Sequence, residues 1–422
     1  MRTDSPAGMP GNPRWLWWAA GLMMANGTYA LTVMGVLIAP LRHLWHLGAV
    51  PEALLASAAL AGTVVGSLAA GLLSDRYGRR VVMLASAAVM LATTGLSAVW
   101  LAYPVLLGSR LVLGLGLGAD FAVMLPYVAE LAPRLTRGGL MVLVMWIGDL
   151  GQLLAYASGL AVSSVSDVRL VLAAGALFLL PTLALRWRLP ESPLWARRPP
   201  PTLPQIARQL AVPYRPALLR AAVPWFLHQI TGQGLGVFLP LLLVALGSAH
   251  GDLASVEVKG LALVAAWFTI RLIDRWGRRP LQLWGFGLRA AALALLGVGA
   301  WVTGTVPPYW SLSLVAMALA AGAFGPDKTT VVLAAESLDT GVRTTGQGVC
   351  EALGRLGGAL GVFFIGLLLA SHQLALGLML MAAAAGAGAW VTRRWTPETA
   401  GQSLPEAPAA LPSPRAPRTA CR

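Results

Sequence analysis

The stretch DRYGRR at residues 75–80 decides the fold, because it recurs as DRWGRR at residues 274–279. Two further landmarks recur at nearly the same separation: a glutamate with an arginine seven positions later (Glu130 and Arg137, Glu336 and Arg343), and PES or PET (190–192 and 397–399). Three landmarks at nearly one separation indicate a duplicated unit. Membrane insertion alone would require basic loops, but not Asp and Gly at fixed positions in both copies.

The composition excludes a soluble protein. Of the 422 residues, 57% are hydrophobic and only 11% are charged, whereas soluble proteins carry about 25% charged residues. The mean hydropathy of +0.69, with 47 Gly and 16 Trp, fits apolar helices that pack on small residues and have aromatic anchors at the membrane interfaces. The sequence therefore predicts an all-α polytopic membrane protein.

Apolar runs of about 20 residues, the length that crosses a bilayer, occur twelve times in the chain. We expect spans at 15–41, 53–73, 81–102, 105–129, 139–163, 168–187, 221–246, 257–273, 281–302, 309–333, 345–370 and 373–392. The domains predicted from them are a cytoplasmic N-terminus (1–14), a six-helix half (15–187), a Pro- and Arg-rich cytoplasmic linker (188–220), a second six-helix half (221–392) and a cytoplasmic tail (393–422).

The charged loops orient the predicted spans. Basic residues gather on one side: Arg76, Arg79, Arg80, Arg134, Arg137, the run 186–220, Arg271, Arg275, Arg278, Arg279, Arg343, Arg393 and Arg394. The other side offers little beyond Arg42, Arg169 and Lys259. The positive-inside rule then predicts a multi-pass protein of the inner (cytoplasmic) membrane with both termini cytoplasmic. It also accounts for the net charge of +14 without nucleic acid as a partner.

The repeated landmarks all fall on this predicted cytoplasmic face, where they could hold the two halves together. Gly78 and Gly277 allow tight turns, and the acidic residues can accept bonds from helix N-termini or arginines. We expect a cytoplasmic gate formed by Asp75, Arg76, Gly78, Arg79, Glu130, Arg137, Asp274, Arg275, Gly277, Arg278, Glu336 and Arg343.

These motifs resemble those of the major facilitator superfamily, in its sugar-porter-like branch, from Trp15 to Leu404. Supporting matches are the glycine pattern from Arg110 to Gly118, ELAP at 130–133, PESP at 190–193 and PET at 397–399. FGPDKTT at 324–330 and Trp225-Phe226 most resemble phosphate:proton and related metabolite symporters. The resemblance implies twelve transmembrane helices in two pseudo-symmetric halves, a central cavity between them and alternating access.

The chain departs from these symporters at coupling positions. Tyr29 is followed by Ala30 where family symporters carry Asp, and Gln229 and Gln233 replace the Asp and Tyr of phosphate symporters. The resemblance places an Asp at Asp120, so proton coupling is expected at Asp120, Asp149 or Asp327, with Arg110 as a partner in need of Asp149 or a substrate anion. Asp120 could instead form a structural pair with an arginine.

Polar stripes on two predicted spans indicate a solute site. Trp225, Gln229 and Gln233 share one helical face, as do Asp149, Gln152 and Tyr156. Amides both donate and accept, which suits hydroxyl-bearing or zwitterionic solutes as well as anions. The expected substrate residues are Trp225, Gln229, Gln233, Asp327, Tyr127 and Gln152. The alternative is that the tryptophan packs and the amides bind neighbouring helices.

His228 is expected to be packed and hydrogen-bonded, and Glu351 and Arg355 are expected to neutralise each other.

The sequence therefore predicts a monomeric secondary transporter of a small polar organic solute, metabolite or sugar-like, most simply a proton symporter. A uniporter, a drug or metabolite exporter and a non-transporting nutrient sensor are the alternatives. We expect no enzyme activity, cofactor or metal site, because the chain has no P-loop, nucleophile or metal-ligand pattern. Cys350 and Cys421 do not suggest a disulfide, and residues 1–13 do not suggest a signal peptide.

Overall fold

A computed structural model describes residues 14–159, 165–197, 201–237, 239–247, 251–303, 307–370 and 373–405. The tail after residue 405 and the N-terminal segment therefore lie outside the described residues. The described part of the chain forms sixteen α-helices. Eleven stretches in it are long and apolar enough to cross a membrane.

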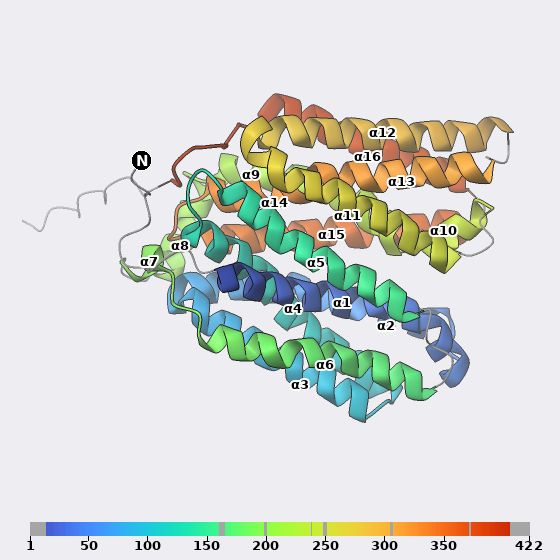
Figure 1. Cartoon of the computed structure of the whole chain (residues 1–422), viewed down its shortest axis with the longest axis horizontal. Coiled ribbons are helices and arrows are strands. Elements are labelled where there is room, and N and C mark those ends of the chain that lie inside the picture. Colours follow the sequence, from blue (N-terminus) through green and yellow to red (C-terminus); the bar gives the residue numbers. More distant parts are fainter. Residues whose placement is uncertain are drawn as a thin grey trace, which may run out of the picture.

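The first six helices pack into one bundle, which we call the first bundle (Figure 1). It consists of α1 (Arg14–Trp45), α2 (Ala49–Tyr77), α3 (Arg79–Val99), α4 (Tyr103–Leu131), α5 (Arg137–Gly159) and α6 (Val165–Trp187). Within it α2 packs on α4, and α1 packs on α5. Small residues permit these contacts: a Cβ on Gly62 would lie 2.2 Å from the Leu111 carbonyl oxygen of α4.

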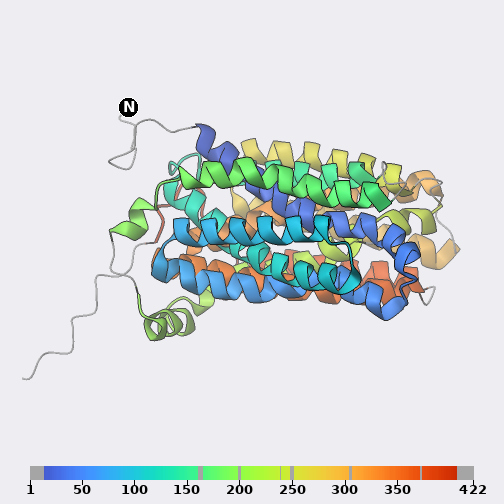
Figure 2. The same cartoon turned by 90° about the horizontal axis from the view of Figure 1, so that it is seen from below.

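The second bundle repeats this arrangement above the first in Figure 1. It consists of α9 (Arg215–Val237), α10 (Leu239–Ala245), α11 (Gly251–Trp276), α12 (Arg278–Thr303), α13 (Pro308–Phe324), α14 (Pro326–Ser337), α15 (Arg343–Ala370) and α16 (Leu374–Trp395). Short helices α7 (Pro193–Ala196) and α8 (Leu203–Ala211) occupy the predicted linker, at the left in Figures 1 and 2. Helices α2 and α15, and α5 and α11, join the two bundles.

The twelve-helix fold is confirmed. The predicted span 221–246 corresponds to α9 and α10, which flank residue 238, a residue outside the described part, and the predicted span 309–333 corresponds to α13 and α14. That span breaks at Pro326, because proline has no N–H to continue the hydrogen bonding. The Thr269 hydroxyl of α11 donates to the Phe324 carbonyl at 2.7 Å, which satisfies an acceptor near the break.

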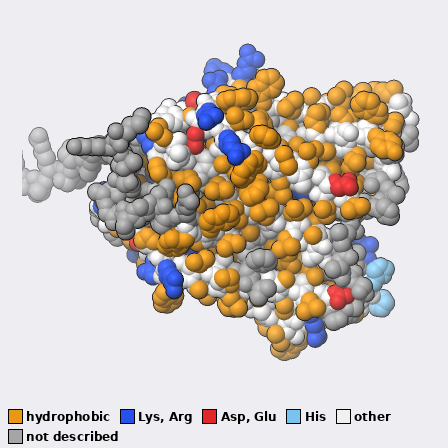
Figure 3. Space-filling view, in the orientation of Figure 1, with side chains coloured by type: hydrophobic (Ala, Val, Ile, Leu, Met, Phe, Trp, Pro, Cys, Tyr) orange, Lys and Arg blue, Asp and Glu red, His pale blue; other side chains and the backbone are white. Residues whose placement is uncertain are grey.

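One end of the molecule carries both copies of the repeated basic loop, and we call it the basic end. Figure 3 shows apolar side chains along the helices and lysine and arginine side chains mainly toward this end. Gly78 and Gly277 have φ values of 105° and 94°, a backbone region that favours glycine, so the predicted tight turns are confirmed. A side chain there would also collide with a carboxylate, since a Cβ on Gly78 would lie 2.4 Å from Glu191.

Candidate functional site

Two glutamates at the basic end explain why the PES and PET segments repeat. The Glu191 carboxylate accepts from the backbone N–H groups of Arg79 at 3.0 Å and Arg80 at 3.1 Å. Glu398 accepts in the same way from the N–H groups of Arg278 and Arg279, at 2.9 and 3.1 Å. Each carboxylate therefore satisfies free donors at the start of a helix, α3 or α12, where negative charge is favourable.

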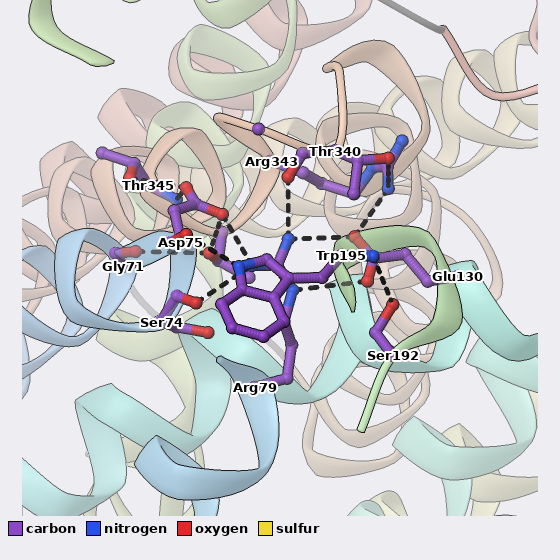
Figure 4. A network of polar contacts seen from close by, with 12 residues as sticks. Gly71, Ser74, Asp75, Arg79, Glu130, Ser192, Trp195, Thr340, Arg343 and Thr345 are labelled. Atoms are coloured by element: carbon purple, nitrogen blue, oxygen red, sulfur yellow. Dashed lines mark hydrogen bonds and ion pairs between the residues drawn. The ribbon is translucent and has the colours of Figure 1, made fainter. Parts of the chain in front are cut away.

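A first charge cluster, made of Asp75, Arg79, Glu130 and Arg343 with neighbouring threonines, fills the junction between the bundles (Figure 4). Within the first bundle, the Arg79 guanidinium lies 3.0 Å from the carboxylates of both Asp75 and Glu130. The side chains of all three residues are fully buried. A buried arginine thus holds two carboxylates in fixed positions facing the second bundle.

The second bundle supplies the other side of this cluster. Arg343 of α15 lies 2.7 Å from Glu130, and the Thr345 N–H and hydroxyl donate to Asp75 at 2.8 and 2.7 Å. Arg79 donates back to the Thr340 carbonyl at 2.8 Å. Glu130 therefore pairs with the arginine of the other repeat, a partner that its spacing from Arg137 does not reveal.

A second charge cluster, Asp274, Arg278 and Glu336, repeats the arrangement. Arg278 lies 2.9 Å from Asp274 and 2.7 Å from Glu336, and the Thr399 hydroxyl donates to Glu336 at 2.6 Å. Across the bundles, the N–H groups of residues 138 and 139 donate to the Asp274 carboxylate at 3.1 and 2.7 Å. This cluster joins the bundles through backbone donors at the start of α5.

The two clusters differ at the arginine that follows each glutamate. Arg343 forms an ion pair across the bundles, but Arg137 reaches only the Gln402 carbonyl at 3.4 Å, and its Nε has no partner in the described part of the chain. Beside Arg137 is a cavity of about 190 Å³, lined also by Arg220 and Glu336. Arg76 and Arg275, which we expected in the gate, are exposed and contribute to neither cluster.

A third group of charges lies inside the bundles, and we call it the interior cluster. Its centre is Lys328 of α14, whose Nζ lies 2.6 Å from Asp149 of α5 and 2.7 Å from Asp327. The Lys328 side chain is only 2% exposed, whereas those of Asp149 and Asp327 are 24% and 29% exposed. Asp149 lies midway along α5, so an ion pair joins the two bundles far from either end of the helix.

His228 and Arg289 extend the interior cluster within the second bundle. His228 Nε2 lies 3.4 Å from Asp327, and Arg289 lies 3.0 Å from both His228 Nδ1 and the Thr231 hydroxyl. The His228 ring stacks on Trp225 with ring centroids 5.4 Å apart. The expected packed, hydrogen-bonded histidine is therefore confirmed, and it covers one face of the Trp225 ring, which was expected to contact the substrate.

Lys259 belongs to this interior region, so its prediction as a residue of the outer side was wrong. Helix α11 begins at Gly251, more than two turns before Lys259, and the Lys259 Nζ donates to Gln152 Oε1 at 3.1 Å. Because Gln152 lies three residues after Asp149, both face α11 and α14 from the same side of α5. Lys259 is close enough to interact electrostatically with Asp149 and Asp327.

The other expected substrate residues lie in different surroundings. Gln229 is buried, and Gln233 packs on Gly358 of α15, where a Cβ would meet its Cγ at 2.9 Å. The Tyr156 hydroxyl donates to the Gly236 carbonyl at 3.0 Å, a bond between the bundles. Tyr127 is buried near the basic end, and its hydroxyl donates to the Pro190 carbonyl at 2.8 Å.

Two expected coupling residues are enclosed within the first bundle. Asp120 forms an ion pair with Arg186 of α6, and both side chains are 1% exposed. This is the structural pairing that the sequence left open for Asp120. Arg110 donates to the Ala30 carbonyl at 2.7 Å, so its expected pairing with Asp149 is wrong, because Asp149 binds Lys328.

Glu351 and Arg355 pair along α15 as their spacing predicts, with 3.8 Å between charged atoms. The Arg355 guanidinium also lies over the Phe121 ring of α4, 4.8 Å from its centroid, which is a contact between the bundles. This pair therefore adds no net charge to the interior.

Sequence reasoning missed three cations that organise the interior. Arg289 could have been recognised from the sequence, because it interrupts an apolar run and a lone arginine inside a span needs partners. Arg186 was counted among loop residues, and Lys259 was placed at a span edge. Lys328 was noticed beside Asp327, but its pairing with Asp149 depends on how the bundles pack.

The fold of two repeated helical bundles, joined by buried charges, defines a multi-pass membrane transporter of the major facilitator type. The chain belongs to the family described as "Sugar (and other) transporter", whose model matches residues 24–198 and 203–411.

Curated relatives agree with this assignment. The inner membrane metabolite transport protein YgcS of Escherichia coli is 28% identical over 418 residues, covering 90% of each chain. The 3-(3-hydroxy-phenyl)propionate transporter of Escherichia coli is 29% identical over 331 residues, covering 76% of this chain and 79% of the relative.

Solved structures share the fold. The proton:xylose symporter XylE, bound to 6-bromo-6-deoxy-D-glucose, superposes with a TM-score of 0.81 at 20% identity and covers 92% of this chain and 97% of that chain. The human organic anion transporter MFSD10 superposes with a TM-score of 0.72 at 19% identity and covers 91% of this chain and 100% of that one.

Proposed function

We propose that the protein is a proton-coupled symporter that carries a small polar organic solute across the cytoplasmic membrane by alternating access. The observation that carries this proposal is the Asp149–Lys328 ion pair, 2.6 Å long, between the bundles. An ion pair between the two bundles stabilises the conformation in which it forms. When one member of the pair is neutralised, that conformation loses stability relative to the others.

Protonation of Asp149 is the proposed coupling step. Neutral Asp149 no longer attracts Lys328, which keeps Asp327 as its partner at 2.7 Å. Losing one ion pair between the bundles favours rearrangement, and solute bound between the bundles restores contacts in the new state. Asp327 has a supporting role, because Lys328 and His228 both approach it.

The basic end is proposed to face the cytoplasm, because its arginines satisfy the positive-inside rule. The first and second charge clusters would then be the cytoplasmic gate, and they are joined across the bundles here. In this arrangement solute reaches the interior cluster from the opposite side. One chain supplies both bundles and all these contacts, so we propose a monomer as the transporting unit.

The relatives support a metabolite as solute. One is described as a 3-(3-hydroxy-phenyl)propionate transporter and another, from Bacillus subtilis, as a putative niacin/nicotinamide transporter. We propose that the solute contacts Gln152, Gln229 and Gln233 beside the interior cluster. Tyr127 is left out of the proposed site because its hydroxyl is engaged by Pro190.

Asp149→Asn tests the coupling. In liposomes, this variant should lose solute accumulation driven by an inward proton gradient and should retain exchange of labelled solute, since exchange requires no net proton movement. The matched control is Glu257→Gln, a neutralised carboxylate on the exposed face of α11. If Asp149→Asn accumulates solute as the native protein does, coupling lies elsewhere. If the native protein accumulates none, a uniporter takes the place of the symporter.

A further inference from the structure

We propose that the transported solute carries a single carboxylate, and that Lys259 binds it next to Asp149. This inference rests on the proposed function, because it names the chemical class of the solute for the same interior site. It follows from the balance of charges in the interior cluster, from the partners of each cation, and from the position of Lys259 relative to Asp149.

The interior of the described chain carries one more cation than carboxylate around this cluster. The residues are four cations and three carboxylates: Lys259, Arg289, Lys328 and Arg355, with Asp149, Asp327 and Glu351. An unbalanced charge inside a membrane protein is costly unless it is paired or faces water. While Asp149 is ionised, a bound anion would remove that imbalance, and when Asp149 is protonated the anion would keep the imbalance from growing. A neutral sugar or a cation would do neither.

The partners of each cation identify which one is available to an anion. Lys328 contacts two carboxylates and Arg355 contacts Glu351. Arg289 is 2% exposed, and three of its five N–H donors are engaged by His228, Thr231 and the Ala318 carbonyl. Lys259 is half-buried, and the contact found for its ammonium in the described chain is a neutral amide oxygen, that of Gln152. Lys259 therefore retains two N–H donors for an incoming carboxylate.

Gln152 adds a second donor to the same place. Its Oε1 accepts from Lys259 at 3.1 Å, which leaves the two N–H donors of the amide for another acceptor. An ammonium and an amide from opposite bundles thus meet one turn from Asp149. A carboxylate that accepts from both would bridge α5 and α11, so its binding would depend on how the bundles are positioned.

The location beside Asp149 explains why a carboxylate and a proton would enter together. A solute carboxylate near Lys259 is repelled by ionised Asp149 and is not repelled by protonated Asp149. Binding of the solute therefore favours proton uptake, and proton uptake favours binding by the same factor. The solute replaces the negative charge that the proton removes, so the charge of the site is the same before and after loading.

The test compares hydroxyl-bearing carboxylates with their amides: D-gluconate with D-gluconamide, and L-lactate with L-lactamide. Binding to purified protein is measured by thermal stabilisation and calorimetry. We expect binding of at least one carboxylate and roughly tenfold or more weaker binding of its amide, the loss of one charge-assisted contact. Lys259→Gln should abolish that preference, and Lys259→Arg should retain it. Carboxylate binding should also take up protons from weakly buffered solution in the native protein and not in Asp149→Asn.

Equal binding of acid and amide, binding of neither carboxylate, or an undiminished preference in Lys259→Gln would overturn the inference. These outcomes are separate from the liposome test of proton coupling. A carboxylate that binds through Lys259 without proton uptake or gradient-driven accumulation would contradict the symport proposal and leave the solute class standing.

Discussion

Asp120 and Asp149 are both carboxylates inside the helices, but their surroundings give them different chemistry. Asp120 is enclosed with Arg186 and Ser86 in the first bundle, where movement between the bundles does not separate the partners. Asp149 is partly exposed and its partner Lys328 belongs to the other bundle. The proposed movement of the bundles would therefore change the surroundings of Asp149 and not those of Asp120.

Asp120→Asn should therefore destabilise the protein without uncoupling transport. Removing one member of a buried ion pair leaves the other charge uncompensated, which costs about 3–5 kcal/mol. We expect a lower unfolding temperature in detergent, and, per folded molecule, unchanged solute accumulation under a proton gradient.

The control is the double variant Asp120→Leu with Arg186→Met, which removes both charges at similar volume. It should recover most of the lost stability, because replacing a whole buried pair by apolar residues is often neutral. Loss of gradient-driven accumulation in folded Asp120→Asn would return the coupling role to Asp120.

Only some residues of the interior cluster could be predicted from the sequence. Isolated carboxylates within apolar runs can be recognised, and Asp149 and Asp327 were predicted on that ground. Their partners could not be predicted, because Lys328 meets Asp149 through the packing of α14 on α5. The roles of Glu191 and Glu398 were missed in the same way, although their repetition was plain from the sequence.

Helices α2 and α15 cross closely at the junction between the bundles. A Cβ on Gly348 would lie 2.3 Å from the Ser67 carbonyl oxygen, and one on Gly71 would lie 2.7 Å from that of Thr344. Backbone atoms thus approach each other without side chains between them, next to the first charge cluster. The closed basic end depends on glycine at this crossing.

Gly348→Ala should shift the protein toward states in which the basic end is open. The added methyl group cannot move away from a backbone oxygen, and overpacking of this kind costs about 1–3 kcal/mol in the closed state. Spin labels at exposed Tyr77 and Trp276, one in each bundle, should report a larger population of long distances. Gly386→Ala, at a position with open space around it, should leave the distances as in the native protein.

Helix positions were predicted well, and the errors have one physical cause. An apolar run ends at the first charged residues, whereas a helix continues through them when they have partners. The predicted span began at residue 257, whereas α11 begins at Gly251, so Lys259 was placed at the edge of the span and assigned to the outer side. The break at Pro326 can be recognised from the sequence, because it depends on local backbone chemistry alone.

At the scale of the whole molecule, the two repeats do not contribute equally to the closed basic end. Arg343 forms an ion pair across the bundles, while the equivalent Arg137 has a cavity beside it and, among the described residues, a contact only to a carbonyl. The repeat in the sequence predicts two equal clusters. The difference arises from packing at the junction, which the pattern of motifs does not encode.

Arg343→Gln should therefore open the basic end far more than Arg137→Gln. Loss of Arg343 removes a buried ion-pair partner of Glu130, and about 3–5 kcal/mol for such a pair corresponds to a population change of about a hundredfold or more. The same two spin labels give the measurement, with Arg137→Gln as the matched variant. Equal responses of the two variants would contradict the asymmetry.

In the proposed transport cycle, the first charge cluster would also make the opening of the basic end depend on water activity. Asp75, Arg79 and Glu130 have fully buried side chains while the basic end is closed, and separating the bundles exposes them to be hydrated. Opening is then accompanied by the uptake of water molecules, so its equilibrium depends on the concentration of free water. An osmolyte excluded from the junction should slow opening in proportion to the water it withholds, so osmotic stress on the side of the basic end would act as a brake on turnover.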